Sequence, residues 1–128
     1  MERKEEMKEE LRVAVIGSRG IDRADLSRYI PEEATMLISG GAMGVDSLAE
    51  AYAAEKGLPI KVIKPQYSLF GKRAPLVRNR QIVECADLVV AIWDGESSGT
   101  AYTIDYAHEK GVPVRLYIPP TKNGKNKA

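Results

Sequence analysis

The sequence predicts an α/β fold with a doubly wound, parallel sheet of five strands. Short apolar runs of strand length alternate along the chain with segments of helical periodicity, and glycine-rich or polar turns follow three of these runs. Such alternation favours parallel strands joined by right-handed crossovers, with helices on both faces of the sheet. At 128 residues, the chain fits one domain that is large enough to bury a sizeable core.

Five apolar runs are the expected strands, and they cover residues 11–16, 35–38, 59–63, 87–93 and 113–118. The first run, LRVAVI, is rich in β-branched residues and almost wholly apolar, which predicts burial on both faces. The best match is a Rossmann-like sheet with the strand order 3-2-1-4-5. We therefore expect a single Rossmann-like domain over residues 11–118, between a charged lead at 1–10 and a basic, disordered tail at 119–128.

Four segments between the strands are expected to be helical, and they cover residues 22–30, 45–56, 76–86 and 101–110. Asp22 is the predicted N-cap of the first helix, and Pro31 is its stop. The candidates for the buried side of the third helix are Leu76, Ile82, Val83 and Cys85.

Residues 64–75 show no clear period and are predicted to form an irregular loop, which in a compact domain is more often functional or mobile than filler. Tyr67 and Phe70 lie in this loop. Core packing is the favoured interpretation of each ring, and stacking on a base is the alternative. Between Glu55 and Glu84 the chain carries basic residues and no acidic one, and cations with aromatic rings suit a phosphate and a stacked base.

Composition narrows the class of protein. The net charge of +1 gives no general argument for nucleic-acid binding, which would need a local cluster of cations. The single cysteine, Cys85, excludes an intramolecular disulfide, suits a reducing cytoplasm and is expected to be a core thiol. No apolar run approaches the ~20 residues that span a bilayer, and the charged N-terminus has no signal peptide. We therefore expect a cytoplasmic protein without a membrane partner.

Three turns at strand ends carry the candidate binding residues: GSRG (17–20), SGGAMG (39–44) and DGESSGT (94–100). In a doubly wound sheet, ligands bind outside the carboxyl ends of the strands where the winding reverses, here between the first and fourth strands. Glycines let the backbone approach a ligand, and helix N-termini offer N–H groups to a phosphate. The predicted phosphate- or ligand-binding residues are Gly17, Ser18, Arg19, Ser39, Gly40, Gly41, Ala42, Gly44, Asp46, Arg78, Asn79, Arg80, Ser98, Gly99 and Thr100.

Two carboxylates belong to this predicted crevice. Asp46 either complements the dipole of its helix or accepts a hydrogen bond from a ribose hydroxyl, and the sequence leaves both open. Asp94 is the candidate base if the site is catalytic, and the other catalytic residues stay unknown. No metal-ligand cluster has a recognisable spacing, so no metal is expected and no cofactor is required.

Four motifs carry a family resemblance: IGSRG, SGGAMGVD, LVRNR, and SSGTA after an apolar strand. Together they resemble the SLOG superfamily of DprA-like and LOG-like proteins, over residues 11–118. The resemblance implies a small stand-alone member that binds a nucleotide or nucleotide-derived ligand. It also implies a homodimer or higher homo-oligomer. Packing or dimer contacts are the expected roles of Trp93, Tyr102 and Tyr106.

Two alternatives to nucleotide binding stay open. One is a DprA-like module that binds single-stranded DNA. The other is a nucleotide N-glycosidase like the LOG-type phosphoribohydrolases, whose motif PGGxGTxxE carries a catalytic glutamate. This chain has GESSGTAYT over residues 95–103, so Thr103 takes the position of that glutamate and the enzymatic activity stays undecided.

Overall fold

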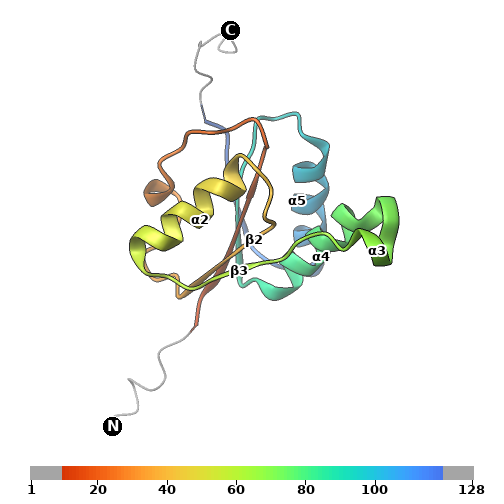
Figure 1. Cartoon of the computed structure of the whole chain (residues 1–128). Coiled ribbons are helices and arrows are strands. Elements are labelled where there is room, and N and C mark those ends of the chain that lie inside the picture. The colour runs from red at the N-terminus through yellow and green to blue at the C-terminus, as the bar shows by residue number, and fades with distance from the viewer. Residues whose placement is uncertain (1–9, 120–128) are drawn as a thin grey trace, which may run out of the picture.

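The structure, a computed structural model, describes residues 10–119 of the chain (Figure 1). Five strands form its sheet: β1 (Arg12–Gly17), β2 (Met36–Ser39), β3 (Ile60–Val62), β4 (Leu88–Ile92) and β5 (Val114–Tyr117). They pair in parallel in the order β3-β2-β1-β4-β5, which confirms the predicted fold class and strand order. The predicted lead and tail lie outside the described residues, apart from residues 10 and 119.

The helices are α2 (Val45–Lys56), α3 (Tyr67–Phe70), α4 (Ala74–Cys85) and α5 (Ser98–Lys110), with 3-10 turns η1 (Leu26–Arg28) and η2 (Gly71–Arg73). Helix α2 and the η1 segment cover one face of the sheet, and α4 and α5 cover the other (Figure 1). Each face has its own core, because successive strand residues point to opposite sides. Val13 and Val15 of β1 belong to the α2 side, whereas Ala14 and Ile16 belong to the α4–α5 side.

The crossover from β1 to β2 differs from the predicted helix over residues 22–30. Only the 3-10 turn η1 forms, and Asp25 rather than Asp22 caps it by accepting a hydrogen bond from the Ser27 backbone N–H at 3.2 Å. Ile30 precedes Pro31, and a residue before proline disfavours helical backbone. The segment instead covers the sheet by burying Leu26 and Ile30 individually.

Residues 64–75 were predicted to form an irregular loop, and this is wrong for most of the segment. Helix α3 and turn η2 form an arm over residues 67–73 that protrudes beside α4 (Figure 1). The helical backbone is interrupted between them at Gly71, which has a φ of 56° and a ψ of −133°. Helix α4 then begins at Ala74, two residues before its predicted start, with Pro75 in its first turn. Proline is well tolerated there because its missing N–H has no intrahelical partner to lose.

The arm also overturns the expected core packing of its two rings. Tyr67 is 60% exposed and Phe70 is 39% exposed. On α4, Ile82 and Val83 are buried as expected, but Leu76 is 37% exposed. Cys85, expected to be a core thiol, is partly exposed at the end of α4.

No helix among residues 10–119 combines the length and the apolar character that crossing a membrane requires.

Candidate functional site

A cavity of about 280 Å³ opens at the carboxyl ends of β1 and β4, where the winding of the sheet reverses. Residues from the turn after β1, the turn after β2, helix α4 and the start of α5 line it, as the convergence of the turns predicts. The predicted site residues in its wall are Gly17, Arg19, Gly40, Ala42, Asp46, Arg78, Asn79, Gly99 and Thr100. The wall is completed by Ile16, Gly20, Ile82, Ser97 and Thr103.

Arg78 is the half-buried cation of this cavity. Its Nη1 donates a hydrogen bond to the Gly40 carbonyl at 2.6 Å, and its Nε donates to Asn79 Oδ1 at 2.7 Å. Burial lowers the pKa of Arg78, and the negative charge of Asp46 opposes that shift. In the described part of the chain, neither of these hydrogen bonds goes to a carboxylate, and Nη2 is left to donate to a ligand.

Gly40 lets the loop after β2 approach Arg78. A Cβ on this buried glycine would lie 2.8 Å from Arg78 Nη1 and 3.0 Å from Asp46 Oδ2. Any side chain at this position would therefore displace the guanidinium or the carboxylate. The neighbouring Gly41, also predicted to contact ligand, has a positive φ of 74° and faces Val62 and Lys64 instead of the cavity.

Asp46 holds the glycine loop in place from the first turn of α2. Its Oδ2 accepts a hydrogen bond from the Ala42 backbone N–H at 2.9 Å, and the residue is only 9% exposed. Burial raises the pKa of its carboxyl, while the Ala42 hydrogen bond and the charge of Arg78 pull the pKa back. The ionised carboxylate therefore costs more free energy in the folded protein than in the unfolded chain.

Asp46→Asn is expected to raise the thermal stability at pH 7, because Asn Oδ1 still accepts from Ala42 and no charge is buried. The raised pKa makes stability fall as the pH rises from the ordinary value of 3.8 through the folded pKa. The gain in Tm of the variant should therefore shrink as the pH approaches 3.8. Thermal unfolding from pH 4 to 8 measures this, and a lower Tm for the variant at pH 7 would contradict it.

The N-terminus of α5 points into the cavity without a side-chain cap. Ser97 is the N-cap residue, but its hydroxyl lies 2.8 Å from Ser18 Oγ and does not bond back to the helix. Gly99 and Thr100, in the first turn, line the cavity. First-turn N–H groups have no partner within a helix, and the dipole of this 13-residue helix adds partial positive charge there.

Asp94, the candidate base, braces this turn instead of lining the cavity. Its Oδ1 accepts hydrogen bonds from the backbone N–H groups of Glu96 and Ser97, both at 2.8 Å. Burial alone would raise the pKa of Asp94, but these hydrogen bonds outweigh it and hold the pKa below its ordinary value. An exposed carboxylate with a lowered pKa is a poor proton acceptor at neutral pH.

Ser18 joins this turn to the turn after β1. Its buried hydroxyl accepts a hydrogen bond from the Asp94 backbone N–H at 3.0 Å, so its role is to fix two walls of the cavity relative to each other.

Ser39 is fully buried, and its Oγ has no hydrogen-bond partner within the described residues. Gly44 packs against the backbone of Arg19, and Ser98 begins α5; neither is in the cavity wall.

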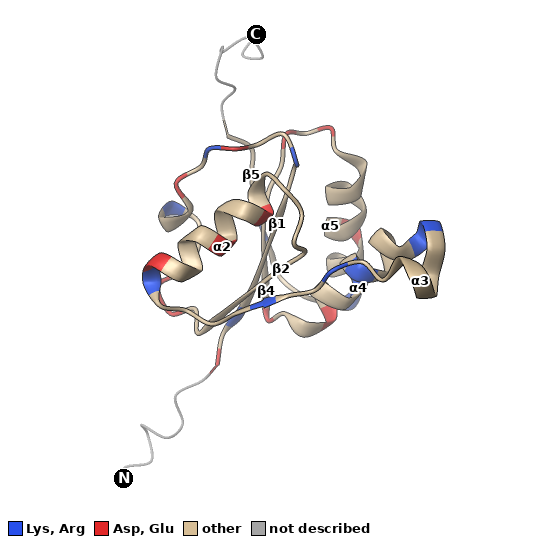
Figure 2. Cartoon of the chain, viewed as in Figure 1, with Lys and Arg blue, Asp and Glu red and all other residues tan. Residues whose placement is uncertain are grey.

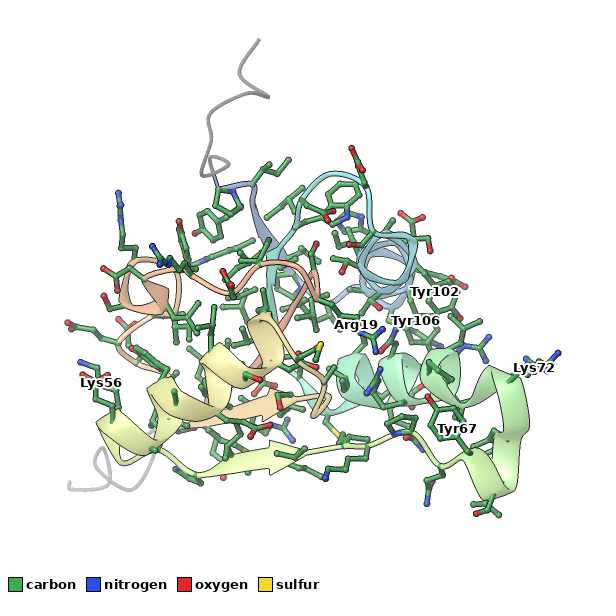
Figure 3. All side chains as sticks on the ribbon, turned by 45° about the horizontal axis from the view of Figure 1, so that its top comes forward. Arg19, Lys56, Tyr67, Lys72, Tyr102 and Tyr106 are labelled. Carbon is green, nitrogen blue, oxygen red and sulfur yellow. The ribbon has the colours of Figure 1, made fainter. Side chains whose placement is uncertain are left out.

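Arg80, predicted beside Arg78 as a phosphate contact, turns away from the cavity. Its Nε donates to the Tyr102 hydroxyl at 2.6 Å, and its guanidinium lies 5.9 Å from the ring centroids of both Tyr102 and Tyr106. Figure 3 shows these two rings along α5. The expected packing role of the tyrosines includes this contact, while self-association of the chain stays a prediction.

Thr103 fills the position of the LOG-type glutamate. Its Oγ1 donates a hydrogen bond to the Gly99 carbonyl at 2.8 Å within α5, and the residue is 2% exposed. The one carboxylate in the cavity wall is Asp46, which is engaged with the loop. Among residues 10–119, no group of three or more His, Cys, Asp or Glu side chains could hold a metal ion.

Fold and cavity define a Rossmann-like α/β domain with an open cavity at the switch point of its sheet. The chain is similar to the X-ray structure of DNA processing protein A (DprA) from Streptococcus pneumoniae, with a TM-score of 0.73 and 19% sequence identity. The similarity covers 93% of this chain and 54% of the DprA chain, so this chain spans about half of that protein. No family model and no curated protein matches the sequence. The likeness establishes a DprA-like fold.

Proposed function

We propose that this SLOG-like domain binds a nucleotide or nucleotide-derived ligand by placing its phosphate in the cavity. The observation that carries the proposal is the convergence of Arg78 and the uncapped N-terminus of α5 on one open cavity. A guanidinium presents donors in a planar fork that matches phosphate oxygens, and free N–H groups at a helix N-terminus match them as well. Both kinds of donor come from rigid helices.

The charges of the cavity wall also favour an anion. Burial disfavours the charged form of Arg78, and the nearby positive charge of Arg19 disfavours it further. Figure 3 shows Arg19 between α2 on one side and α4 and α5 on the other. Among the described residues, Asp46 is the one carboxylate in the wall and offsets the charge of Arg78 in part, so Arg19 and Arg78 leave the wall with a net positive charge that a bound phosphate would neutralise.

Arg78→Ala tests the proposal. It removes a charge-assisted contact worth roughly 1.5–3 kcal/mol, which corresponds to about a 10- to 100-fold loss of affinity. Isothermal titration with inorganic phosphate and nucleoside monophosphates measures the loss. Lys56→Ala is the matched control, since it removes one positive charge at the far end of α2, away from the cavity (Figure 3). Equal affinities for wild type and Arg78→Ala would contradict the proposal.

Binding of single-stranded DNA is the second candidate, and one observation favours it. The arm and the segment leading to it carry exposed cations outside the cavity, at Lys61, Lys64, Lys72 and Arg73 (Figure 2). The structurally similar protein is named as a DNA-processing protein. In this case affinity should rise with oligonucleotide length and fall steeply with salt, whereas a mononucleotide site shows no length dependence. The same titration with oligonucleotides separates the two.

Glycosidic hydrolysis has less support than either binding function. The buried hydroxyl of Thr103 donates to the Gly99 carbonyl of its own helix, and among residues 10–119 no general base is hydrogen-bonded to it that could activate it in place of the carboxylate of the LOG-type motif. The carboxylates of Asp94 and Asp46 each accept a backbone hydrogen bond that holds a turn or loop in place, from Ser97 and from Ala42 respectively. We therefore propose a binding role for the cavity and no catalytic one.

A further inference from the structure

Among the described residues, Asp46 is the one acidic side chain in the cavity wall, and the loop uses only part of its capacity to accept hydrogen bonds. A carboxylate offers about four lone-pair positions to donors. The Ala42 N–H takes one of them at 2.9 Å, and the Gly40 N–H, which lowers the pKa of the carboxyl, can take a second. The carboxylate therefore has acceptor positions left for a ligand in the cavity.

Holding the glycine loop in place does not require a negative charge at residue 46. An asparagine could accept the hydrogen bond from the Ala42 N–H through its Oδ1. The aspartate is only 9% exposed, and burial raises its pKa, so its charge lowers the stability of the folded protein. A charge that costs stability in the wall of a cavity indicates a role in binding.

The cavity is polarised between two ends. Strands β2 and β4 both pair with β1, so the segments that follow them begin two strand spacings apart, about 10 Å. Asp46 lies on the segment after β2, and Gly99 and Thr100 lie in the first turn of α5, after β4. Figure 3 shows Arg19 between α2 and α5. One end of the cavity therefore accepts hydrogen bonds, and the other donates them.

We infer that Asp46 accepts hydrogen bonds from the sugar hydroxyls of the ligand whose phosphate binds at the N-terminus of α5. The inference rests on the proposed function and narrows it to ligands with a hydroxyl-bearing sugar. A phosphate itself suits the Asp46 end poorly, because two negative charges repel each other. Sugar hydroxyls are uncharged donors and suit the short O–H···O⁻ hydrogen bonds that a carboxylate accepts.

Two nucleotides that differ only in their sugar hydroxyls test this inference by isothermal titration. They are adenosine 5′-monophosphate and 2′,3′-dideoxyadenosine 5′-monophosphate, and inorganic phosphate is the third titrant. Wild type should prefer the nucleotide with hydroxyls by roughly 10- to 100-fold, the effect of a hydrogen bond to a charged group. Asp46→Asn keeps an acceptor without the charge and should reduce the preference to about its square root, roughly 3- to 10-fold. Asp46→Ala should abolish the preference.

Glu50→Gln is the matched control. Glu50 is exposed on the same helix, α2, and lies outside the cavity wall, so its substitution removes one negative charge without touching the site. This variant should keep the wild-type preference. Inorganic phosphate should bind Asp46→Asn at least as tightly as wild type, because the wall loses a negative charge.

The contrary outcomes separate this inference from the proposed function. Wild-type protein that binds phosphate without preferring the nucleotide with hydroxyls overturns the role of Asp46 and leaves the phosphate site in place. The same holds if Asp46→Ala keeps the full preference, or if Asp46→Asn weakens all three titrants equally. Wild-type protein that binds none of the three overturns the proposed function and the role of Asp46 with it.

Discussion

Gly99→Val is expected to abolish phosphate binding and to leave the fold as stable as the wild type. Gly99 lines the cavity in the first turn of α5, and a Cβ added there meets no atom within 4 Å. The isopropyl group would therefore stand in the open space that a phosphate must enter to reach the helix N–H groups. Valine is a better helix former than glycine by a few tenths of a kcal/mol, so the stability should not fall.

Two measurements check this result. Titration with inorganic phosphate should give an affinity at least about 100-fold below wild type, equivalent to roughly 2.8 kcal/mol. Gly99→Ala, with a smaller side chain at the same place, should lose less and gain about 0.5–1 kcal/mol of stability. If the valine variant has both the phosphate affinity and the melting temperature of the wild type, the anion binds elsewhere and the prediction is wrong.

Gly44→Ala is expected to have the largest effect on stability. Gly44 has a φ of 75°, and a Cβ there would overlap the carbonyl of Arg19, whose carbon would be only 2.7 Å away. With a ψ of −128°, Gly44 occupies a backbone region almost confined to glycine, which costs an alanine about 1–3 kcal/mol, and forcing the two turns apart adds about 1–3 kcal/mol. Both turns belong to the cavity, so ligand binding should weaken as well.

Gly57→Ala is the matched control for this variant. Gly57 caps the end of α2 with a φ of 69°, and a Cβ there meets nothing within 4 Å. It should lose only the backbone part, about 1–2 kcal/mol. Urea unfolding should therefore show a clearly larger loss for Gly44→Ala, both because its backbone region is less accessible to alanine and because of the contact with Arg19. Equal losses would contradict the close packing of the two turns.

The strand order and the place of the cavity could be predicted from the sequence. The apolar runs were continuous enough to mark buried parallel strands, and parallel strands bring their carboxyl ends to one edge. Gly20 and Ser97, which were missed, lie inside turns that the sequence had already marked. Ile82 was recognised as core only, although helical spacing puts it on the same face as Arg78.

The same geometry explains why Arg80 was misplaced in the predicted crevice. Residues two apart on a helix point about 200° apart, so Arg78 and Arg80 cannot both face the cavity. Assigning one to the cavity required knowledge of which side of α4 meets the sheet. Gly40 and Gly41 pose a similar problem, because neighbouring glycines in a turn differ only in backbone dihedrals that the sequence does not specify.

The arm could not be predicted because it lacks the signal on which helix prediction depends. Residues 67–73 bury no side chain, so no apolar periodicity marks them. As large aromatic residues, Tyr67 and Phe70 are expected in the core. Their exposure follows from their place on a protruding segment, which the sequence does not indicate.

The most direct test of the phosphate site is a two-dimensional ¹H–¹⁵N NMR titration of the wild-type protein with inorganic phosphate. We expect the largest shifts on the backbone amides of Gly99 and Thr100 and on the guanidinium of Arg78, which share the cavity wall. Shifts concentrated instead on Lys64, Lys72 and Arg73 would place the anion along the arm and contradict the account.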